Sequence, residues 1–163
     1  MNWNKNIKPF ILIFLVSAFC NVPFSLAAGP EAVLGPWYTD KKEARIEIYR
    51  CGTKYCGKIA WMKEPNYSAD ADSGVPGTPK LDQHNPVPEL RKRTMLGLQI
   101  LYGFEYAGDK HWKNGKIYNP DNGKMYSAKM TLIAPDQLKV RGFLGISLIG
   151  GSTVWTRAKP GSY

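Results

Sequence analysis

Apolar and polar residues alternate with a period of two along much of the chain beyond residue 43, the pattern typical of β-strands with one buried face. Ile46 and Ile48 alternate with charged neighbours, and Leu138 and Val140 do so near the C-terminus. The pattern predicts a strand that begins at Gly35, a hairpin over about residues 43–63, and strands at residues 98–106, 116–118, 124–133, 137–143 and 152–157. Consecutive strands are expected to pair antiparallel, because only short turns separate most of them.

Turn residues are frequent throughout the chain. The 163 residues include 16 Gly and 12 Pro, which suits a fold with many turns better than a helical bundle. An open sheet of about eight strands leaves two edges unpaired, and closure into a barrel removes both edges. We therefore predict an all-β protein with a single, approximately eight-stranded antiparallel barrel.

One long irregular segment, about residues 64–93, interrupts the strands. It contains five prolines, and loops of this length in compact domains are often functional. Residues 85–93 can hold one short helix, because Pro88 suits a first turn and Glu89 suits the N-terminal end of the helix dipole. The barrel is therefore expected to carry one long loop with a short helix.

The N-terminal residues form a different kind of segment. Lys5 and Lys8 precede an apolar run over residues 10–20, and Ser25 and Ala27 fit the −3 and −1 positions of a cleavage site. We predict a signal peptide at 1–27, a single barrel domain at 28–163, and a periplasmic or secreted protein without a transmembrane segment after cleavage. The alternative is an uncleaved anchor, although the run is short for a bilayer of about 30 Å. If it is retained, we expect the run to form a helix outside the barrel core.

The net charge bears on possible partners. The chain has 22 Lys and Arg against 13 Asp and Glu, a net charge of +9, and removal of Lys5 and Lys8 lowers it to +7. Nucleic acid is not an expected partner, because an exported protein is separated from the nucleic acids of the cell and because the lysines are scattered along the chain. A small anionic or amphipathic ligand fits this charge better.

Two cysteines remain after cleavage, Cys51 and Cys56, because Cys20 lies in the predicted signal peptide. They stand at the ends of the two strands of the first hairpin, where Cβ atoms can approach to about 4 Å, and an exported protein meets an oxidising compartment. We predict a disulfide between them. The alternatives are a metal site, which needs two more ligands, and a redox pair, which normally has two intervening residues.

The long loop holds the strongest candidate binding cluster: Asp82, Asn85, Arg91 and Arg93. Arginine forks bind carboxylates and phosphates through paired hydrogen bonds. Two arginines at i and i+2 point to different sides, so at most one of them faces a ligand. The alternative is structural: Asp82 or Glu89 pairs with Arg91, and Asn85 caps the short helix.

Interior barrel positions are the second candidate site, because eight-stranded barrels either fill with side chains or hold one small ligand. Tyr118 and Tyr126 are candidate ligand contacts, and Arg141 is a third if its charged strand face points inward. Aromatic side chains on strands also form ordinary core. The aromatic residues that can line a cavity are Tyr49, Trp61, Tyr102, Phe104, Tyr118, Tyr126 and Phe143.

Candidate catalytic and metal-binding groups are few. The two histidines, His84 and His111, can bind zinc with Asp82 or Asp109, but their spacing is not a known ligand pattern. The Asp70-x-Asp72-x-Gly74 segment resembles part of a calcium loop, yet the twelfth position is Leu81 where a bidentate acid is needed. We therefore expect no catalytic residue, no metal and no cofactor.

Two tryptophans suggest a particular barrel. The first strand begins Gly35-Pro36-Trp37 and the last ends Trp155-Thr156-Arg157, an arrangement that resembles the calycins, including lipocalins. In those barrels a Gly-x-Trp tryptophan closes one end and a basic residue from the last strand packs over it. The resemblance assigns structural roles to Trp37 and Arg157.

Nearly the whole mature chain resembles the bacterial domain of unknown function 2147 family. The resemblance implies an exported calycin-like barrel and no settled activity. Thr94 departs from the proline that often follows the second arginine in the family. The matching blocks are Gly35–Trp37, Ile48–Cys51, Cys56–Trp61, Asp82–Pro86, Leu90–Arg93, Gly97, Gly115–Pro120, Gly123–Ala128, Leu138–Gly142 and Trp155–Arg157.

Three functions from different classes remain. The first is an exported, non-catalytic barrel that binds a small ligand, and it requires an enclosed volume above about 300 Å³ in the barrel. The second is a cell-envelope interaction module with a filled barrel, and the third is a hydrolase. A histidine beside a carboxylate in a cleft would favour the hydrolase. The sequence does not predict an oligomeric state.

Overall fold

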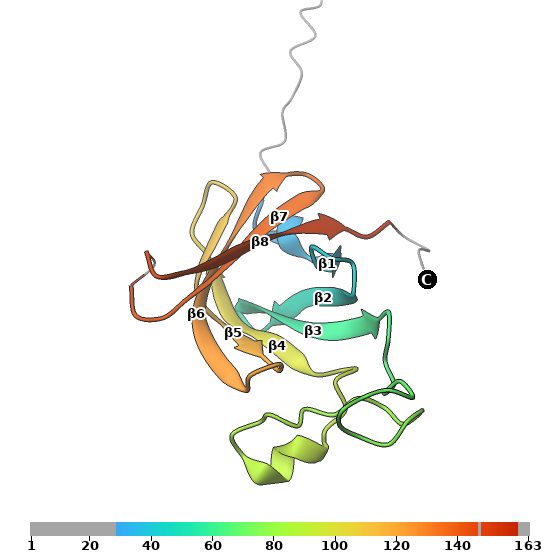
Figure 1. Cartoon of the computed structure of the whole chain (residues 1–163). Coiled ribbons are helices and arrows are strands. Elements are labelled where there is room, and N and C mark those ends of the chain that lie inside the picture. The colour runs from blue at the N-terminus through green and yellow to red at the C-terminus, as the bar shows by residue number, and fades with distance from the viewer. Residues whose placement is uncertain (1–28, 147, 160–163) are drawn as a thin grey trace, which may run out of the picture.

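The chain folds into a closed, eight-stranded antiparallel barrel in which each strand pairs with its neighbour in sequence and β8 pairs with β1 (Figure 1). The computed structural model describes residues 29–146 and 148–159. This architecture confirms the predicted fold class. The strands are β1 Gly35–Tyr38, β2 Ala44–Cys51, β3 Lys54–Met62, β4 Gln99–Tyr106, β5 His111–Asn119, β6 Lys124–Ala134, β7 Gln137–Phe143 and β8 Gly150–Arg157, with 3-10 helices η1 Pro30–Val33 and η2 Pro88–Lys92.

Strand β5 is longer than the predicted 116–118 segment. Its first half departs from simple alternation, because the register shifts between Trp112 and Gly115 and Asn114 has a left-handed φ of 60°. Because of this bulge, the buried residues Trp112 and Gly115 are three positions apart and not two. The alternation of apolar and polar residues therefore does not indicate the first half of the strand. The predicted signal peptide and the expected helix at residues 10–20 lie outside the described residues.

Trp37 closes one end of the barrel. Its side chain is fully buried, and its indole Nε1 donates a hydrogen bond to the Val33 carbonyl oxygen at 2.8 Å. The Arg157 guanidinium lies 4.1 Å from the Trp37 ring centroid and donates to the carbonyl oxygens of Ala32 and Leu34. Arg157 thereby ties η1 to the last strand, which is the arrangement that the calycin resemblance implies.

Aromatic side chains fill the half of the barrel next to this closed end. Tyr55, Phe104 and Trp112 are buried, and the Trp112 ring meets the Tyr55 ring edge-on at a centroid distance of 6.2 Å. Gly115 faces Phe104 so closely that a Cβ at Gly115 would overlap the Phe104 ring, which is why no side chain stands there. This packing leaves the opposite half as the part of the barrel that can be hollow.

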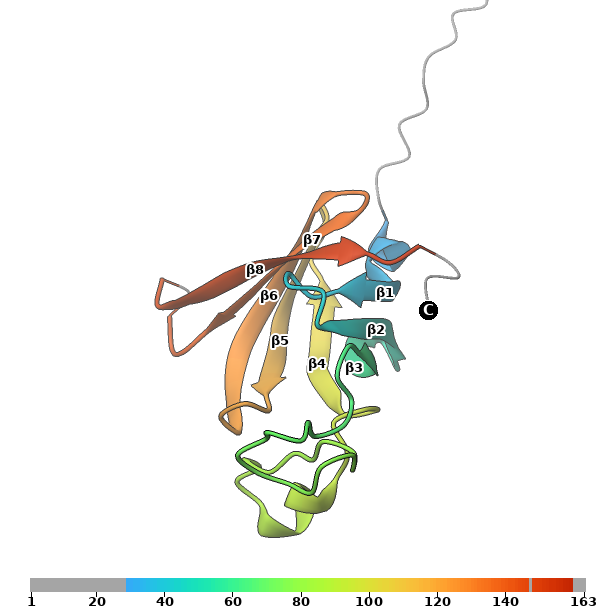
Figure 2. The same cartoon turned by 45° about the vertical axis from the view of Figure 1, so that its right-hand side comes forward.

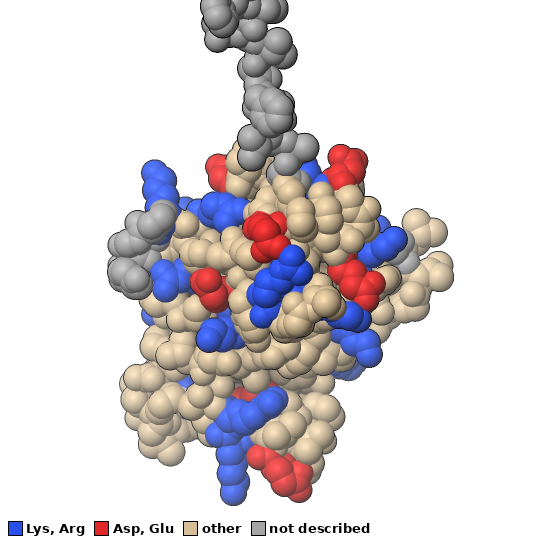
Figure 3. Space-filling model, turned by 180° about the vertical axis from the view of Figure 1, so that it is seen from behind, with Lys and Arg blue, Asp and Glu red and all other residues tan. Residues whose placement is uncertain are grey.

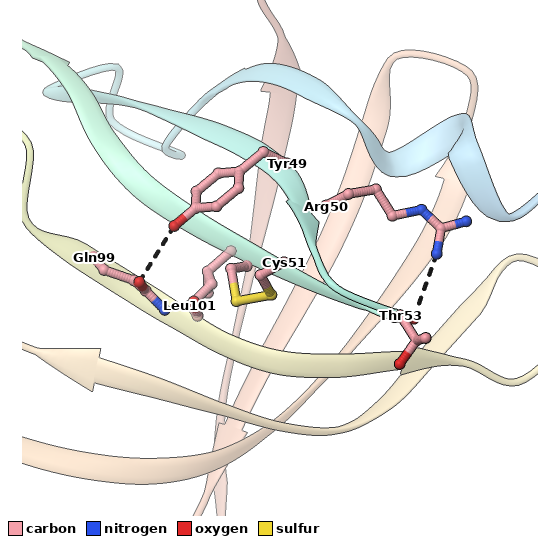
Figure 4. The surroundings of a disulfide bond; sticks show 7 residues. Tyr49, Arg50, Cys51, Thr53, Gln99 and Leu101 are labelled. Atoms are coloured by element: carbon pink, nitrogen blue, oxygen red, sulfur yellow. Dashed lines mark hydrogen bonds between the residues drawn. A yellow bond between two sulfur atoms is a disulfide. The ribbon is translucent and has the colours of Figure 1, made fainter.

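The predicted disulfide between Cys51 and Cys56 is confirmed. The two Cα atoms lie 5.8 Å apart at the turn of the β2–β3 hairpin (Figure 4). Tyr49, on the same hairpin, donates from its hydroxyl to Gln99 Oε1 of β4 at 3.2 Å, which links the hairpin to the next strand. The disulfide therefore fixes one edge of the closed end.

The segment between β3 and β4, residues 63–98, is here called the β3–β4 loop. Figures 1 and 2 show it as a separate layer beyond the ends of β3 and β4, beside the β5–β6 turn. Bridges between Asn66 and Pro79 and between Leu81 and Thr94 hold it together internally. Its helix is the five-residue η2, so the predicted short helix is present.

Within the part of the chain that the structure describes, no helix is long and apolar enough to cross a membrane.

Candidate functional site

The barrel is hollow at the end opposite Trp37. A cavity of about 630 Å³ opens there, lined in part by residues of the β1–β2 and β5–β6 turns and of the base of the β7–β8 hairpin. Its wall is largely apolar, and Asp40, Lys41, Glu43 and Asp121 lie around it among the turn residues. The apolar and aromatic residues that line it are Ala44, Ile46, Ile59, Met62, Met95, Ile100, Ile117, Tyr118, Tyr126, Val140 and Trp155.

Of the aromatic residues predicted to line a cavity, Tyr118 and Tyr126 do so. Phe104 lies in the filled half, and Trp61 packs its ring against Tyr38 at 5.9 Å. The other predicted aromatics, Tyr49, Tyr102 and Phe143, do not line this cavity. The aliphatic lining was missed because alternation identifies the two faces of a strand without saying which face points inward.

Arg141, a candidate ligand contact if its strand face points inward, does not line the cavity. Its neighbours Val140 and Gly142 line the cavity, so Arg141 occupies the outer face of β7. There its guanidinium donates to Ser152 Oγ at 3.0 Å and to the Leu148 carbonyl oxygen at 3.3 Å. The charged face of β7 is therefore the solvent face.

The β3–β4 loop is fixed to the barrel by a buried polar cluster around Asp82. The Asp82 carboxylate is fully buried and accepts hydrogen bonds from the Tyr118 hydroxyl at 2.6 Å, from Asn85 Nδ2 at 2.8 Å and from Arg93 Nη2 at 3.0 Å. Tyr118 belongs to β5, so this cluster joins the loop to the strand that lines the cavity. The structure thus brings four of the predicted site residues together in a structural role.

Two details of the structural alternative are wrong. Asp82 pairs with Arg93, whereas Arg91 donates from Nε to the Asn85 backbone oxygen at 2.7 Å. Asn85 does not cap η2, because the N-cap residue is Val87; the Asn85 side chain instead accepts from the Val87 N–H at 2.9 Å. The proline-rich chain bends before the helix begins, which moves Asn85 out of the capping position.

A smaller hollow of about 300 Å³ lies between the loop and the outer ends of β4, β5 and β6. Asn85, Arg93 and Tyr118 line it together with Tyr102 and Gly123. Gly123 has a φ of +66°, and a Cβ there would overlap the His84 carbonyl oxygen, so the loop backbone lies directly on the β5–β6 turn. This close approach explains why a glycine stands at that turn.

Burial and the hydrogen bond to Asp82 raise the pKa of the Tyr118 hydroxyl to about 12. Desolvation opposes the phenolate, and a carboxylate that accepts the phenolic proton opposes it further. Tyr118 is therefore a neutral donor throughout the range in which an ordinary tyrosine, with a pKa of about 10, begins to ionise.

This difference predicts a pH dependence of stability. Because the pKa of Tyr118 is higher in the folded than in the unfolded chain, its stabilising contribution is complete below pH 10 and is lost as the pH rises towards 12. The free energy of unfolding falls between pH 9 and pH 11, and this fall should be about 1 kcal/mol smaller in Tyr118→Phe than in the wild type. Urea unfolding of both proteins at both pH values measures the difference. Tyr55 and Tyr102 remain in the variant, so an unchanged slope would contradict the Tyr118 assignment.

His84 and Asp121 both line a third hollow of about 240 Å³ beside the β3–β4 loop. This is the combination that the hydrolase interpretation requires, but among the described residues no hydrogen bond or ion pair joins the two side chains. His111 lies elsewhere, with Nδ1 against the Asp109 backbone oxygen. In the described ranges, no group of three or more His, Cys, Asp or Glu residues is placed to hold a metal ion.

Charged side chains of both signs are mixed on the face of the molecule that Figure 3 draws. Figure 3 shows Lys and Arg side chains on several parts of the face opposite to that of Figure 1, with Asp and Glu side chains among them. A nucleic-acid site usually gathers its basic residues in one patch or stripe. The distribution on this face is not of that kind.

A barrel of eight sequentially paired antiparallel strands, sealed by a tryptophan under an arginine and open at the other end, defines a lipocalin-like protein. Among solved structures, the chain is similar to protein HP1028 from the human pathogen Helicobacter pylori, described as belonging to the lipocalin family. The two share 20% identity with a TM-score of 0.63, over 78% of this chain and 83% of that one. At this identity the likeness concerns the fold.

The family follows from the sequence. The model of the family described as uncharacterized protein conserved in bacteria (DUF2147) matches residues 35–157, so the chain belongs to this family. The match spans the barrel from the first residue of β1 to the last of β8. A search of curated proteins found no match.

Proposed function

We propose that this protein is an exported, non-catalytic binding protein that holds one small apolar or amphipathic molecule in the open half of its barrel. The cavity of about 630 Å³ carries the proposal. It is about twice the 300 Å³ at which small-molecule pockets begin. A barrel packed with side chains would have no such space, which favours ligand binding over the filled interaction module.

The lining favours an apolar body over a compact anion. Ile46, Ile59 and Val140 present hydrocarbon to the interior. Arg93 is committed to Asp82, and Arg141 is on the outer face. A ligand with an acyl or aromatic body would bury its apolar surface on this wall and leave a polar end at the mouth, near Asp40, Lys41 and Asp121. This argument narrows the anionic or amphipathic ligand expected from composition to the amphipathic kind.

Titration with the neutral fluorophore N-phenyl-1-naphthylamine tests the proposal. We expect saturable binding at one site per protein, because the cavity of about 630 Å³ inside the barrel has a largely apolar wall, and we expect a lipid extract of the native cells to displace the dye. Binding that does not saturate, or that lipids do not displace, would count against a defined site.

Export is the second part of the proposal, and the disulfide supports it because structural disulfides persist in oxidising compartments. We expect the protein isolated from its native cells to begin at Ala28, with the mass of a 136-residue chain carrying one disulfide. Measuring the intact mass with and without reductant gives both the length of the chain and the number of disulfides. A chain that retains residues 1–27, or two free thiols in the isolated protein, would contradict export by cleavage.

A further inference from the structure

The tip of the β7–β8 hairpin is an exposed apolar turn. Beyond the last paired residues, Phe143 and Gly150, the chain runs through Leu144, Ile146, Leu148 and Ile149. These four side chains are between 56% and 83% exposed, and none belongs to the barrel core. Figures 1 and 2 show the hairpin projecting well beyond the barrel wall.

The described part of the tip has a defined shape. The Leu144 N–H donates to the Ile149 carbonyl oxygen, and the Ile149 N–H donates to the Ile146 carbonyl oxygen, both at 3.2 Å. Arg141 braces the turn from below through its hydrogen bond to the Leu148 carbonyl oxygen at 3.3 Å. The apolar side chains are therefore presented by a hydrogen-bonded turn.

Cations stand directly behind this tip. Lys129 of β6 lies opposite Arg141 of β7 in the ladder, and Lys139 is two residues further along the same outer face. Residues 122–163 contain six Lys and Arg and one acid, Asp136. Asp136 precedes β7, at the end of that strand away from the tip. Arg141 and Lys129 stand three residues behind Leu144, about 10 Å along the hairpin, and Lys139 stands about 17 Å behind it. The distance of the first two matches the depth at which interfacial segments enter a bilayer.

We propose that the β7–β8 tip docks this protein on the surface of an anionic lipid bilayer. The four apolar side chains enter the interface, while Lys129 and Arg141 lie at the level of the anionic headgroups and Lys139 lies just outside them. A bilayer fits this surface better than a folded partner does. A stable protein interface buries about 1,200–2,000 Å² in total, and the tip of one narrow hairpin offers less than this.

The base of the same hairpin forms part of the cavity wall. Gly142, Gly151 and Thr153 line the cavity a few residues from the tip. Docking at the tip would therefore bring the cavity mouth near the bilayer, and lipids or other lipophilic molecules would be the ligand class within reach. This last step rests on the proposed function, whereas docking itself does not.

Vesicle co-sedimentation tests the proposal with protein isolated from its native cells. Vesicles of phosphatidylglycerol with phosphatidylethanolamine are compared with vesicles of phosphatidylcholine. We expect preferential binding to the anionic vesicles, reduced at least tenfold by the double substitution Leu148→Ser and Ile149→Ser. Arg141→Gln should weaken binding to the anionic vesicles about fivefold. The matched control, Val75→Ser with Val87→Ser, replaces two exposed apolar residues of the β3–β4 loop and should bind as wild type.

Each alternative outcome overturns docking at the tip. One such outcome is that the tip variant and the wild type bind the vesicles equally well. Another is that the wild type does not bind them. If light scattering shows a wild-type dimer that the tip substitutions convert to a monomer, without vesicle binding, then the tip joins two copies of the chain. The variant Thr153→Phe, which fills part of the cavity, separates the two proposals. It should bind the dye more weakly and bind the vesicles as the wild type does.

Discussion

Replacing Thr153 with Phe is expected to weaken dye binding by about fivefold to a hundredfold. Thr153 lies on the inner face of β8, opposite Val140 in the ladder, and lines the cavity. A phenyl ring there occupies space that a ligand would use, and forcing a ligand against it costs about 1–3 kcal/mol, as overpacking a core does. Fluorescence titration with N-phenyl-1-naphthylamine gives the affinity.

The neighbouring position supplies a matched control. Val154 is one residue further along β8, is 38% exposed and faces solvent, so Val154→Phe adds the same ring outside the barrel. We expect its dye affinity to remain within about twofold of wild type. If Thr153→Phe and Val154→Phe bind the dye equally well, then the dye does not occupy the cavity.

Replacing Asp82 with Ala is expected to lower the free energy of unfolding by about 2–4 kcal/mol. The substitution removes the acceptor of three hydrogen bonds. It leaves the buried Tyr118 hydroxyl without its acceptor and the Asn85 amide with only its 3.3 Å hydrogen bond to that hydroxyl. Urea denaturation measures the change. Hydrogen exchange should show faster exchange in residues 80–95 than in β7 and β8, because the cluster fixes the β3–β4 loop to the barrel.

Two variants control for the loss of charge. Asp82→Asn keeps the shape of the side chain and one acceptor oxygen, so it should destabilise less than Asp82→Ala. Asp121→Ala removes an exposed carboxylate near the same loop and should change stability by less than about 0.5 kcal/mol. A stability of Asp82→Ala within that same range would mean that the cluster does not hold the loop.

The barrel was predictable because its determinants are local. Alternation at Ile46 and Ile48, the turn residues between strands, and the placement of Trp37 and Arg157 at the two ends of the pattern are all visible along the chain. The alternation did not show the bulge at Asn114, because a residue with left-handed φ shifts the strand faces by one position; the only signal in residue type is the Asn114-Gly115 pair, which tolerates a left-handed φ but is more typical of a turn than of a strand interior. Strand number was therefore predictable, and the length of β5 was not.

The candidate site was predictable only as a set of residues. The sequence singled out Asp82, Asn85, Arg93 and Tyr118, and the structure joins them in one buried cluster. Their partners depend on how the loop backbone bends, which is why Arg91 was expected where Arg93 stands. The residues of the cavity wall depend on which face of each strand points into the barrel. Closure of the whole barrel determines this, and no single segment of the sequence does.

Native mass spectrometry of protein isolated from its own cells tests the central claim most directly. Isolation under non-denaturing conditions preserves a ligand that the cavity holds tightly. The proposal predicts a native mass above that of the denatured chain by a few hundred daltons, with the extra species recovered in an organic extract. A native mass equal to that of the chain alone, together with a barrel that fails to bind N-phenyl-1-naphthylamine, would contradict it.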